Sequence, residues 1–213
     1  MMAGKIAPEP IIFIKEKVII IEGAGELALF EGMCSRLNID SQIIKMNGVY
    51  NIRNLLALVK NSDTFEIIKS LAVVRDADGN KNSAFDSIKD ALTAKGFPSP
   101  ASNGLYASDG KIRVGVMIIP PDESCGMLED LLLKTIENDA TRIRADDFLL
   151  GAVIERELNE KEPPPSNISK ARLQCYLSVM REHTNSVFLA IKKNYIDLDH
   201  VELESVREFL RML

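Results

Sequence analysis

The sequence predicts an α/β fold: a four-stranded, mainly parallel sheet flanked by helices, followed by an all-helical C-terminal extension. Up to about residue 139, short apolar segments alternate four times with segments of helical spacing, which is typical of parallel strands joined by helical crossovers. The apolar segments are continuous rather than alternating with polar residues, which indicates strands buried on both faces. With 213 residues, 46% of them hydrophobic, the chain can bury one sizeable core.

Four strands are predicted because four short runs, rich in β-branched residues, stop at turn-forming residues. They cover residues 17–21, 41–46, 67–75 and 111–119. The stop signals include Glu22-Gly23, Asn47-Gly48 and the prolines at 120 and 121. Residues 98–110, rich in Ser, Gly and Pro, are predicted to form a loop.

Helices are predicted where apolar residues recur three and four positions apart. In the first part of the chain they cover residues 26–37, 52–60, 83–95 and 126–138. After residue 139 only helical patterns remain, at 148–158, 171–182 and 203–213, with an exposed, charged and proline-rich link at 160–165. We therefore expect an α/β domain over residues 1–139 and a helical extension over residues 140–213 that packs on it.

The composition excludes several classes of protein. The 26 Lys and Arg against 31 Asp and Glu give a net charge of −5, which disfavours a passive nucleic-acid coat but leaves room for an enzyme that grips phosphate through metal ions. Three cysteines without CxxC spacing and two histidines indicate neither a disulfide framework nor a zinc site. Without a signal peptide or an apolar run near the ~20 residues of a membrane span, we expect a cytoplasmic protein with no membrane partner.

Acidic residues follow two of the predicted strands. Glu22 comes directly after the first strand, and Asp76 and Asp78, followed by Gly79, come after the third. Because ligand sites in open parallel sheets form outside the carboxyl ends of the strands, these carboxylates are expected to lie together. Mg²⁺ or Mn²⁺ would suit such oxygen ligands. The alternative is that Asp-x-Asp-Gly is ordinary turn chemistry.

Two segments carry a family resemblance. Val-Ile-Ile-Ile-Glu-Gly at 18–23 and Val-Val-Arg-Asp-Ala-Asp at 73–78 resemble the toprim domain of topoisomerases, bacterial primases, small ribosomal-RNA maturases and OLD-type nucleases. The resemblance covers roughly residues 17–139 and implies a Rossmann-like sheet. Gly-Met-Leu-Glu-Asp at 126–130, with the helical tail, resembles a group of small uncharacterised toprim-like proteins related to the OLD nucleases.

The toprim resemblance assigns roles to the motif residues. It implies that Glu22 is a general acid/base or a metal ligand and that Asp76 and Asp78 hold Mg²⁺. Gly23, which follows the glutamate in the motif, is a further site candidate.

The OLD-like pattern adds three candidates. It implies a second acid four residues after the glutamate, where this chain has Glu26 in place of the usual Asp; one helical turn separates the two positions, so both can reach one site. It also implies an acid after the fourth strand, for which Glu129 is the candidate, and a lysine beyond the toprim fold, for which Lys170 is the candidate. The alternatives are a first-turn helix acid at Glu129 and a surface lysine at Lys170.

These residues suggest a metal-dependent nuclease or phosphotransfer protein that acts on phosphodiester bonds, since one or two cations can activate water and neutralise phosphate. Nucleic acid or a nucleotide would be the partner. The chain lacks a GxxxxGK[ST] ATPase motif, so a protein partner could supply targeting. The oligomeric state stays open.

Three other functions fit parts of the sequence. The protein could be a catalytically silent nucleic-acid or nucleotide-binding regulatory module. Asp76 could be the nucleophile of a haloacid-dehalogenase-like phosphatase, with Asp78 as acid/base. The Gly-Ala-Gly-Glu-Leu-Ala segment at 23–28 also matches a loose dinucleotide-binding fingerprint, although Glu22 and Glu26 would place negative charge beside a pyrophosphate.

Overall fold

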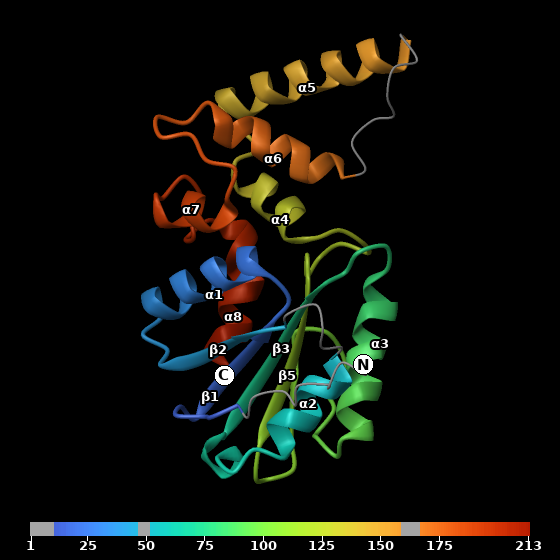
Figure 1. Cartoon of the computed structure of the whole chain (residues 1–213), viewed down its shortest axis with the longest axis vertical. Coiled ribbons are helices and arrows are strands. Elements are labelled where there is room, and N and C mark those ends of the chain that lie inside the picture. Colours follow the sequence, from blue (N-terminus) through green and yellow to red (C-terminus); the bar gives the residue numbers. More distant parts are fainter. Residues whose placement is uncertain (1–10, 47–51, 159–166) are drawn as a thin grey trace, which may run out of the picture.

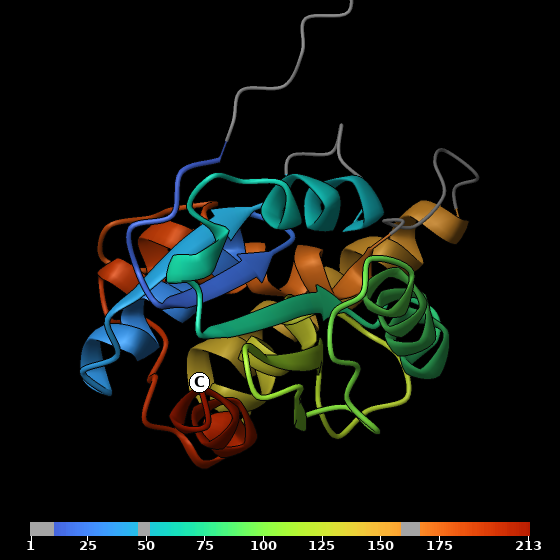
Figure 2. The ribbon, with the colours of Figure 1, turned by 90° about the horizontal axis from the view of Figure 1, so that it is seen from below.

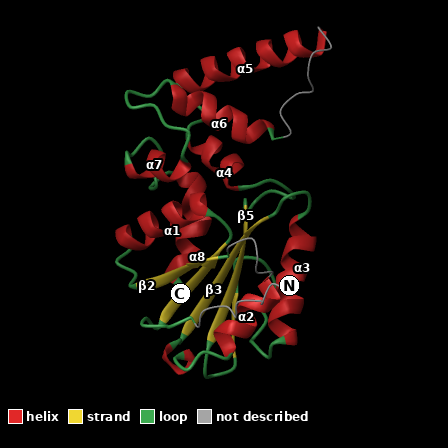
Figure 3. Cartoon of the chain, viewed as in Figure 1, coloured by secondary structure: helices red, strands yellow, loops and turns green. Residues whose placement is uncertain are grey.

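The computed structural model describes residues 11–46, 52–158 and 167–213, which form an α/β protein with one central sheet (Figures 1 and 3). The sheet has the strand order β2–β1–β3–β5–β4. Its strands are β1 (Lys17–Ile21), β2 (Ser41–Lys45), β3 (Ser70–Asp76), β4 (Tyr106–Ser108) and β5 (Arg113–Ile119). The first three and β5 run parallel, and β4 pairs antiparallel with β5.

Eight α-helices lie within the described residues. They are α1 (Ala24–Arg36), α2 (Ile52–Lys60), α3 (Lys81–Ala94), α4 (Leu128–Thr135), α5 (Ala140–Leu158), α6 (Ile168–Ser178), α7 (Val187–Lys192) and α8 (Glu204–Arg211). Two short 3₁₀ helices, Phe65–Ile67 and Val201–Leu203, precede β3 and α8. In the described ranges, no helix combines the length and apolarity needed to cross a membrane.

The expectation of four strands was wrong, because residues 98–110 are not all loop. They contain β4, in which Tyr106 pairs with Gly115 of β5. A Cβ at Gly115 would stand 2.5 Å from the Tyr106 ring, and that ring stacks on Phe209 of α8 with a centroid distance of 4.8 Å. A strand of three residues is too short to show a period in the sequence.

Two other differences concern the C-terminal part. The predictions missed α7, which has six residues and begins after Ser186 as its N-cap. Helix α5 begins at Ala140 rather than at residue 148. The predicted link at 160–165 lies outside the described residues.

The sheet is buried on both faces, because successive residues of each strand enter two different cores. Ile19, Ala72 and Met117 pack with α1, α4 and the C-terminal helices, whereas Val18, Leu71 and Val116 pack with α2 and α3. Figure 2 shows the helices on the two sides of the sheet. The continuously apolar strands of the sequence are the consequence.

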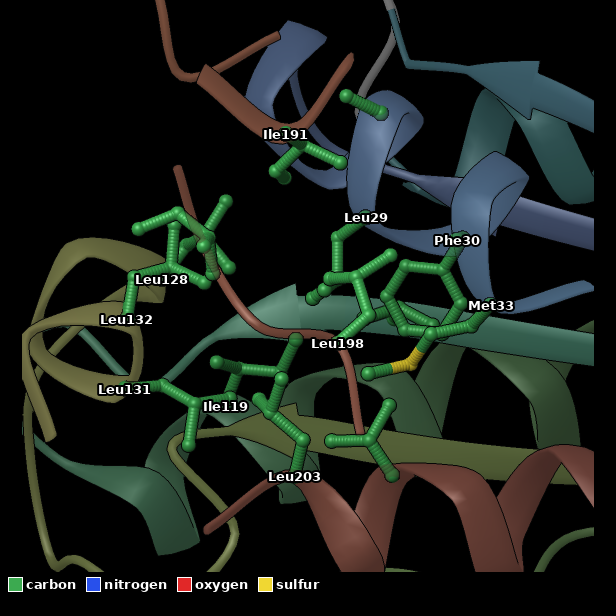
Figure 4. Close-up of a cluster of buried hydrophobic side chains, with 14 of the residues drawn as sticks. Leu29, Phe30, Met33, Ile119, Leu128, Leu131, Leu132, Ile191, Leu198 and Leu203 are labelled. Carbon is green, nitrogen blue, oxygen red and sulfur yellow. The ribbon is translucent and has the colours of Figure 1, made fainter. Parts of the chain in front are cut away.

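The C-terminal helices belong to the first of these cores. Leu198 and Leu203 lie with Ile119 of β5 and with Leu29 and Met33 of α1 in one buried cluster (Figure 4). The helical extension therefore packs on the α/β part, while the domain boundary at residue 139 stays a prediction.

The strand order reverses beside β1. The chain leaves β1 for α1 on one face of the sheet and leaves β3 for α3 on the other face. Two adjacent parallel strands whose connections diverge to opposite faces create a crevice at their carboxyl ends. This topological switch point fixes where a site can form.

Candidate functional site

A cavity of about 500 Å³ lies at the switch point, between the ends of β1 and β3 and the helices α4, α6 and α7. All the predicted site residues line it: Glu22, Gly23, Glu26, Asp76, Asp78, Glu129 and Lys170. The structure therefore brings together residues that are as much as 148 positions apart in the sequence.

Glu26 stands in the first turn of α1, where Gly23 is the N-cap and offers no side chain to the free N–H groups. The Glu26 carboxylate folds back over Gly23, so that a Cβ there would stand 2.8 Å from its Oε2 atom. Burial raises the pKa of Glu26, hydrogen bonds from the Glu26 and Gly23 backbone oppose the rise, and Glu129 and Glu22 add to it. The Glu26 carboxylate thus accepts hydrogen bonds from N–H groups at the start of α1 and adds negative charge to the cavity.

Asp76 is the most strongly perturbed acid of the cavity. Its Oδ1 atom accepts a hydrogen bond of 3.0 Å from the Leu128 N–H at the start of α4. Burial raises its pKa to about 8, helped by repulsion from Glu26, Glu22 and Glu129. The pKa of this half-buried carboxyl is therefore raised in part by three other carboxylates.

Asp78 is fixed by its backbone. Its φ of +49° is left-handed, a conformation that Asp tolerates better than most residues, and its carbonyl accepts a 2.7 Å hydrogen bond from the Gly126 N–H. Its side chain is 58% exposed at the cavity mouth, where Oδ2 lies 3.6 Å from the Arg75 guanidinium. Asp78 is thereby held close to Asp76 at the exit of β3.

Two cationic side chains lie among the acids. The Arg75 guanidinium contacts both Asp78 and Glu22, the latter with Nε–Oε2 at 3.7 Å. The Lys170 Nζ atom of α6 lies 3.7 Å from Oε1 of Glu129, whose side chain is 10% exposed. These distances exceed hydrogen-bond length, so the contacts are loose ion pairs.

The oxygen donors suit a hard divalent cation. In the described ranges no three His, Cys, Asp or Glu side chains form a ready-made ligand group, and Arg75 and Lys170 stand beside three of the acids. The donor set nevertheless consists of carboxylates alone, which favours Mg²⁺ or Mn²⁺ over zinc. The repulsion that raises the Asp76 pKa is also what a bound cation would relieve.

The wall formed by the C-terminal helices could not be predicted from the sequence. Gln174 of α6 and Asn185 before α7 line the cavity with amide groups. Neither has a motif that marks it, because only the fold brings them to the strand ends. Arg75 did stand inside the toprim-like motif, and its place next to Asp76 was the signal that could have identified it.

The glycines of the segment 23–28 have a packing role. A Cβ at Gly25 would stand 2.8 Å from Leu128 and 3.6 Å from Val187, so glycine lets α1 approach α4 and α7 closely. Glu22 and Glu26 also line the space before α1. This arrangement argues against a pyrophosphate at the helix N-terminus.

Comparison with known proteins gives a family and two similar structures. A family model described as "Protein of unknown function (DUF3226)" matches residues 16–213, and no curated protein matches. The C-terminal region of the Xanthomonas campestris pv. campestris OLD protein is similar with a TM-score of 0.45 and 13% identity, covering 94% of this chain and 97% of the other. A hypothetical protein from Pyrococcus horikoshii OT3 is similar with a TM-score of 0.45 and 12% identity, covering 93% and 95%. A function must therefore be argued from the residues of the site.

Asp76→Asn should change how stability depends on pH. The Asp76 pKa lies above its ordinary value when the protein is folded, so between about pH 4 and pH 8 the folded state holds a proton that the unfolded state has lost, and the free energy of unfolding falls as the pH rises. Asn keeps the acceptor for Leu128 without the charge. In a chelating buffer, the melting temperature of Asp76→Asn should exceed that of wild type by several degrees at pH 8 and by less at pH 5.

The control for this measurement is Asp86→Asn, on the exposed surface of α3. It should follow the wild-type pH profile. If the melting temperatures of wild type and Asp76→Asn changed with pH in parallel, the pKa of Asp76 would not be raised in the folded protein.

Proposed function

The chain belongs to the DUF3226 family, and we propose that its acidic cavity binds Mg²⁺ or Mn²⁺ and hydrolyses phosphodiester bonds in a nucleic acid or nucleotide. The observation that carries the proposal is that Glu22, Glu26, Asp76 and Glu129 line one cavity at the topological switch point, where the other three acids raise the pKa of half-buried Asp76. Such a cluster is costly without a cation, and a structural ion pair would not need so many acids.

Asp76, Asp78, Glu26 and Glu129 are the residues that would hold the cation. Asp76 and Asp78 follow one strand, and Glu26 and Glu129 come from the first turns of α1 and α4. When bound, the cation supplies positive charge for the phosphate oxygens and makes water a better nucleophile near neutral pH.

Glu22 is suited to act as the general acid/base. Its side chain is 44% exposed at the cavity mouth, so it can exchange a proton with water or with a leaving oxygen. Arg75 contacts both Glu22 and Asp78, and so holds the Glu22 carboxylate on the side of Asp78. The toprim resemblance of residues 18–23 and 73–78 supports the same role.

Arg75 and Lys170 can act in two ways, depending on whether a cation is bound. In the absence of a cation they offset the charge of Glu22, Asp78 and Glu129. With the acids neutralised, both groups could turn to the oxygens of a phosphodiester, since a guanidinium can bind two phosphate oxygens at once and an ammonium acts as a point charge.

The same geometry disfavours the phosphatase alternative. A nucleophilic aspartate must be ionised and free to attack, whereas the half-buried Asp76 carboxyl accepts a hydrogen bond from the Leu128 N–H and has a pKa raised to about 8. The binding-module alternative remains as one outcome of the activity test below.

Asp76→Ala/Asp78→Ala should abolish binding of Mn²⁺, because it removes the two adjacent ligands at the end of β3. Calorimetric titration of the chelator-treated protein measures this directly. The control is Asp86→Ala/Asp90→Ala, which removes the same charge from the exposed side of α3 and should titrate like wild type. Equal heats for wild type and the Asp76/Asp78 variant would exclude the metal site.

Arg75→Met should strengthen binding of Mn²⁺. The variant frees the ligand Asp78 from a partly exposed ion pair worth about 0.2–1 kcal/mol, so the affinity should rise roughly 1.4- to 5-fold. The metal-free protein should melt at a lower temperature. Arg53→Met, on the exposed side of α2, is the control. Weaker Mn²⁺ binding by Arg75→Met would show that Arg75 assists cation binding rather than competing with it.

Cleavage of supercoiled DNA, single-stranded DNA or RNA should require Mg²⁺ or Mn²⁺. Glu22→Gln should lower the rate by about 10²–10⁴-fold, the usual loss of a general acid/base, and should keep the wild-type Mn²⁺ affinity. Glu31→Gln, on the exposed side of α1, should cleave normally. Loss of Mn²⁺ binding by Glu22→Gln would show that Glu22 is a metal ligand. A metal-loaded protein that cuts none of these substrates would favour the regulatory binding module.

A further inference from the structure

We propose that the wall of the acidic cavity formed by α6, α7 and the segment between them is a subsite for a nucleobase, built from Gln174, Asn185 and Phe188. The substrate therefore enters as an unpaired nucleotide, either within a single strand or free. This inference rests on the proposed function and names the substrate class of the same site. The two helices lie at the end of the sheet where the cavity forms (Figure 1), and all three residues line it.

Helix α6 presents a lysine and an amide to the cavity on one face. Lys170 and Gln174 are four positions apart, so they lie on the same side of the helix, about 6 Å apart along its axis. Both line the cavity, and the Lys170 Nζ atom lies 3.7 Å from Oε1 of Glu129 in its acidic part. Because the sugar separates the phosphate of a nucleotide from its base, a phosphate beside Lys170 places the base at the level of Gln174.

The segment after α6 brings a second amide and an aromatic ring to the same wall. The Thr184 N–H donates a 3.3 Å hydrogen bond to the Leu177 carbonyl, which holds the neighbouring Asn185 beside the last turn of α6. Phe188, in the first turn of α7, lines the cavity and is half-buried. The Lys192 ammonium lies 4.6 Å from the centroid of its ring and helps to hold the ring in place. An aromatic ring that is partly accessible in a cavity can stack on a base.

The amides of Gln174 and Asn185 are available to a ligand. Both side chains are exposed, and within the described part of the chain neither has a hydrogen-bond partner. Other amides of the protein hold the backbone instead: those of Asn80 and Asn167 cap helices, and that of Asn103 accepts a hydrogen bond from a strand. A free amide offers a donor and an acceptor side by side, which is the pattern that pairs with the edge of a base such as adenine.

The size of the cavity favours an unpaired base. Its volume of about 500 Å³ is that of a site for one small molecule. A base pair cannot enter such a space while one of its bases contacts Gln174 and Phe188. A paired base must first be extruded from the stack at a cost in free energy, whereas the base of a single strand or of a free nucleotide enters without that cost.

Calorimetric titration of the Mn²⁺-loaded full chain tests the subsite with two probes. Adenosine monophosphate and ribose phosphate differ only in the base, and neither contains a phosphodiester bond, so neither is cut. Stacking tolerates every base and changes the affinity by about 5- to 150-fold, so adenosine monophosphate should bind more tightly than ribose phosphate by that factor. Equal affinities, with Mn²⁺ still bound, would overturn the subsite and leave the proposed cation site intact.

Two variants locate the base. Phe188→Leu keeps an apolar side chain at this position and should remove most of the difference between the two probes. Gln174→Ala should weaken binding of adenosine monophosphate about 2- to 13-fold, the usual range for one hydrogen bond. Both should bind Mn²⁺ and ribose phosphate like wild type, which also shows that they are folded. The control is Asn61→Ala, which removes an exposed amide after α2. Unchanged binding of adenosine monophosphate by both variants would overturn the proposal.

An oligonucleotide tests whether the base must be unpaired. The Mn²⁺-loaded Glu22→Gln variant, which cuts slowly, should bind a labelled single strand at least about 10-fold more tightly than the same strand in a duplex. Equal binding of strand and duplex would overturn the unpaired substrate, and a strand that binds no more tightly than adenosine monophosphate would identify the free nucleotide as the ligand. If wild type binds no Mn²⁺, the proposed function fails, and the two small probes without metal still decide the subsite.

Discussion

The constraint on which the site depends is the cost of holding Asp76 at the end of a buried strand among other acids. That cost raises the Asp76 pKa to about 8, through burial and through repulsion by Glu26 and Glu22. The protein offsets part of it with the Leu128 N–H at the start of α4, where the helix dipole also favours negative charge. The remaining cost must be offset by positive charge, either from the basic side chains at the cavity or from a metal ion.

This constraint explains why the C-terminal helices pack where they do. Helix α4 supplies the N–H for Asp76, α6 brings Lys170 to Glu129, and the segment before α7 closes the cavity with Asn185. Leu177 of α6, and Leu198 and Leu203 after α7, lie in the core that contains Ile119. The helical extension therefore completes the site and the core together, and removing it would expose the acids and one apolar face of the sheet at once.

The sequence predicted the parts that depend on local patterns. Helix α2 has the predicted bounds, 52–60, because its apolar residues keep one clear stripe, and β1 is the predicted 17–21 because its apolar run is short and stops at Glu22-Gly23. The beginning of α5 was missed, since its first turns are held by polar contacts such as the 3.0 Å ion pair between Arg142 and Asp146 rather than by an apolar stripe. The acids that line the cavity could be chosen because the ends of parallel strands meet. Gln174 and Asn185 could not, because their positions depend on how distant helices pack.

Helix α6 connects the cavity to the outer face of α5. Leu173, Gln174 and Leu177 line the acidic cavity, whereas Cys175, Ser178 and Val179 line a hollow against α5. The two sets alternate around one helix, so a shift of α5 that moves α6 must also move a wall of the cavity.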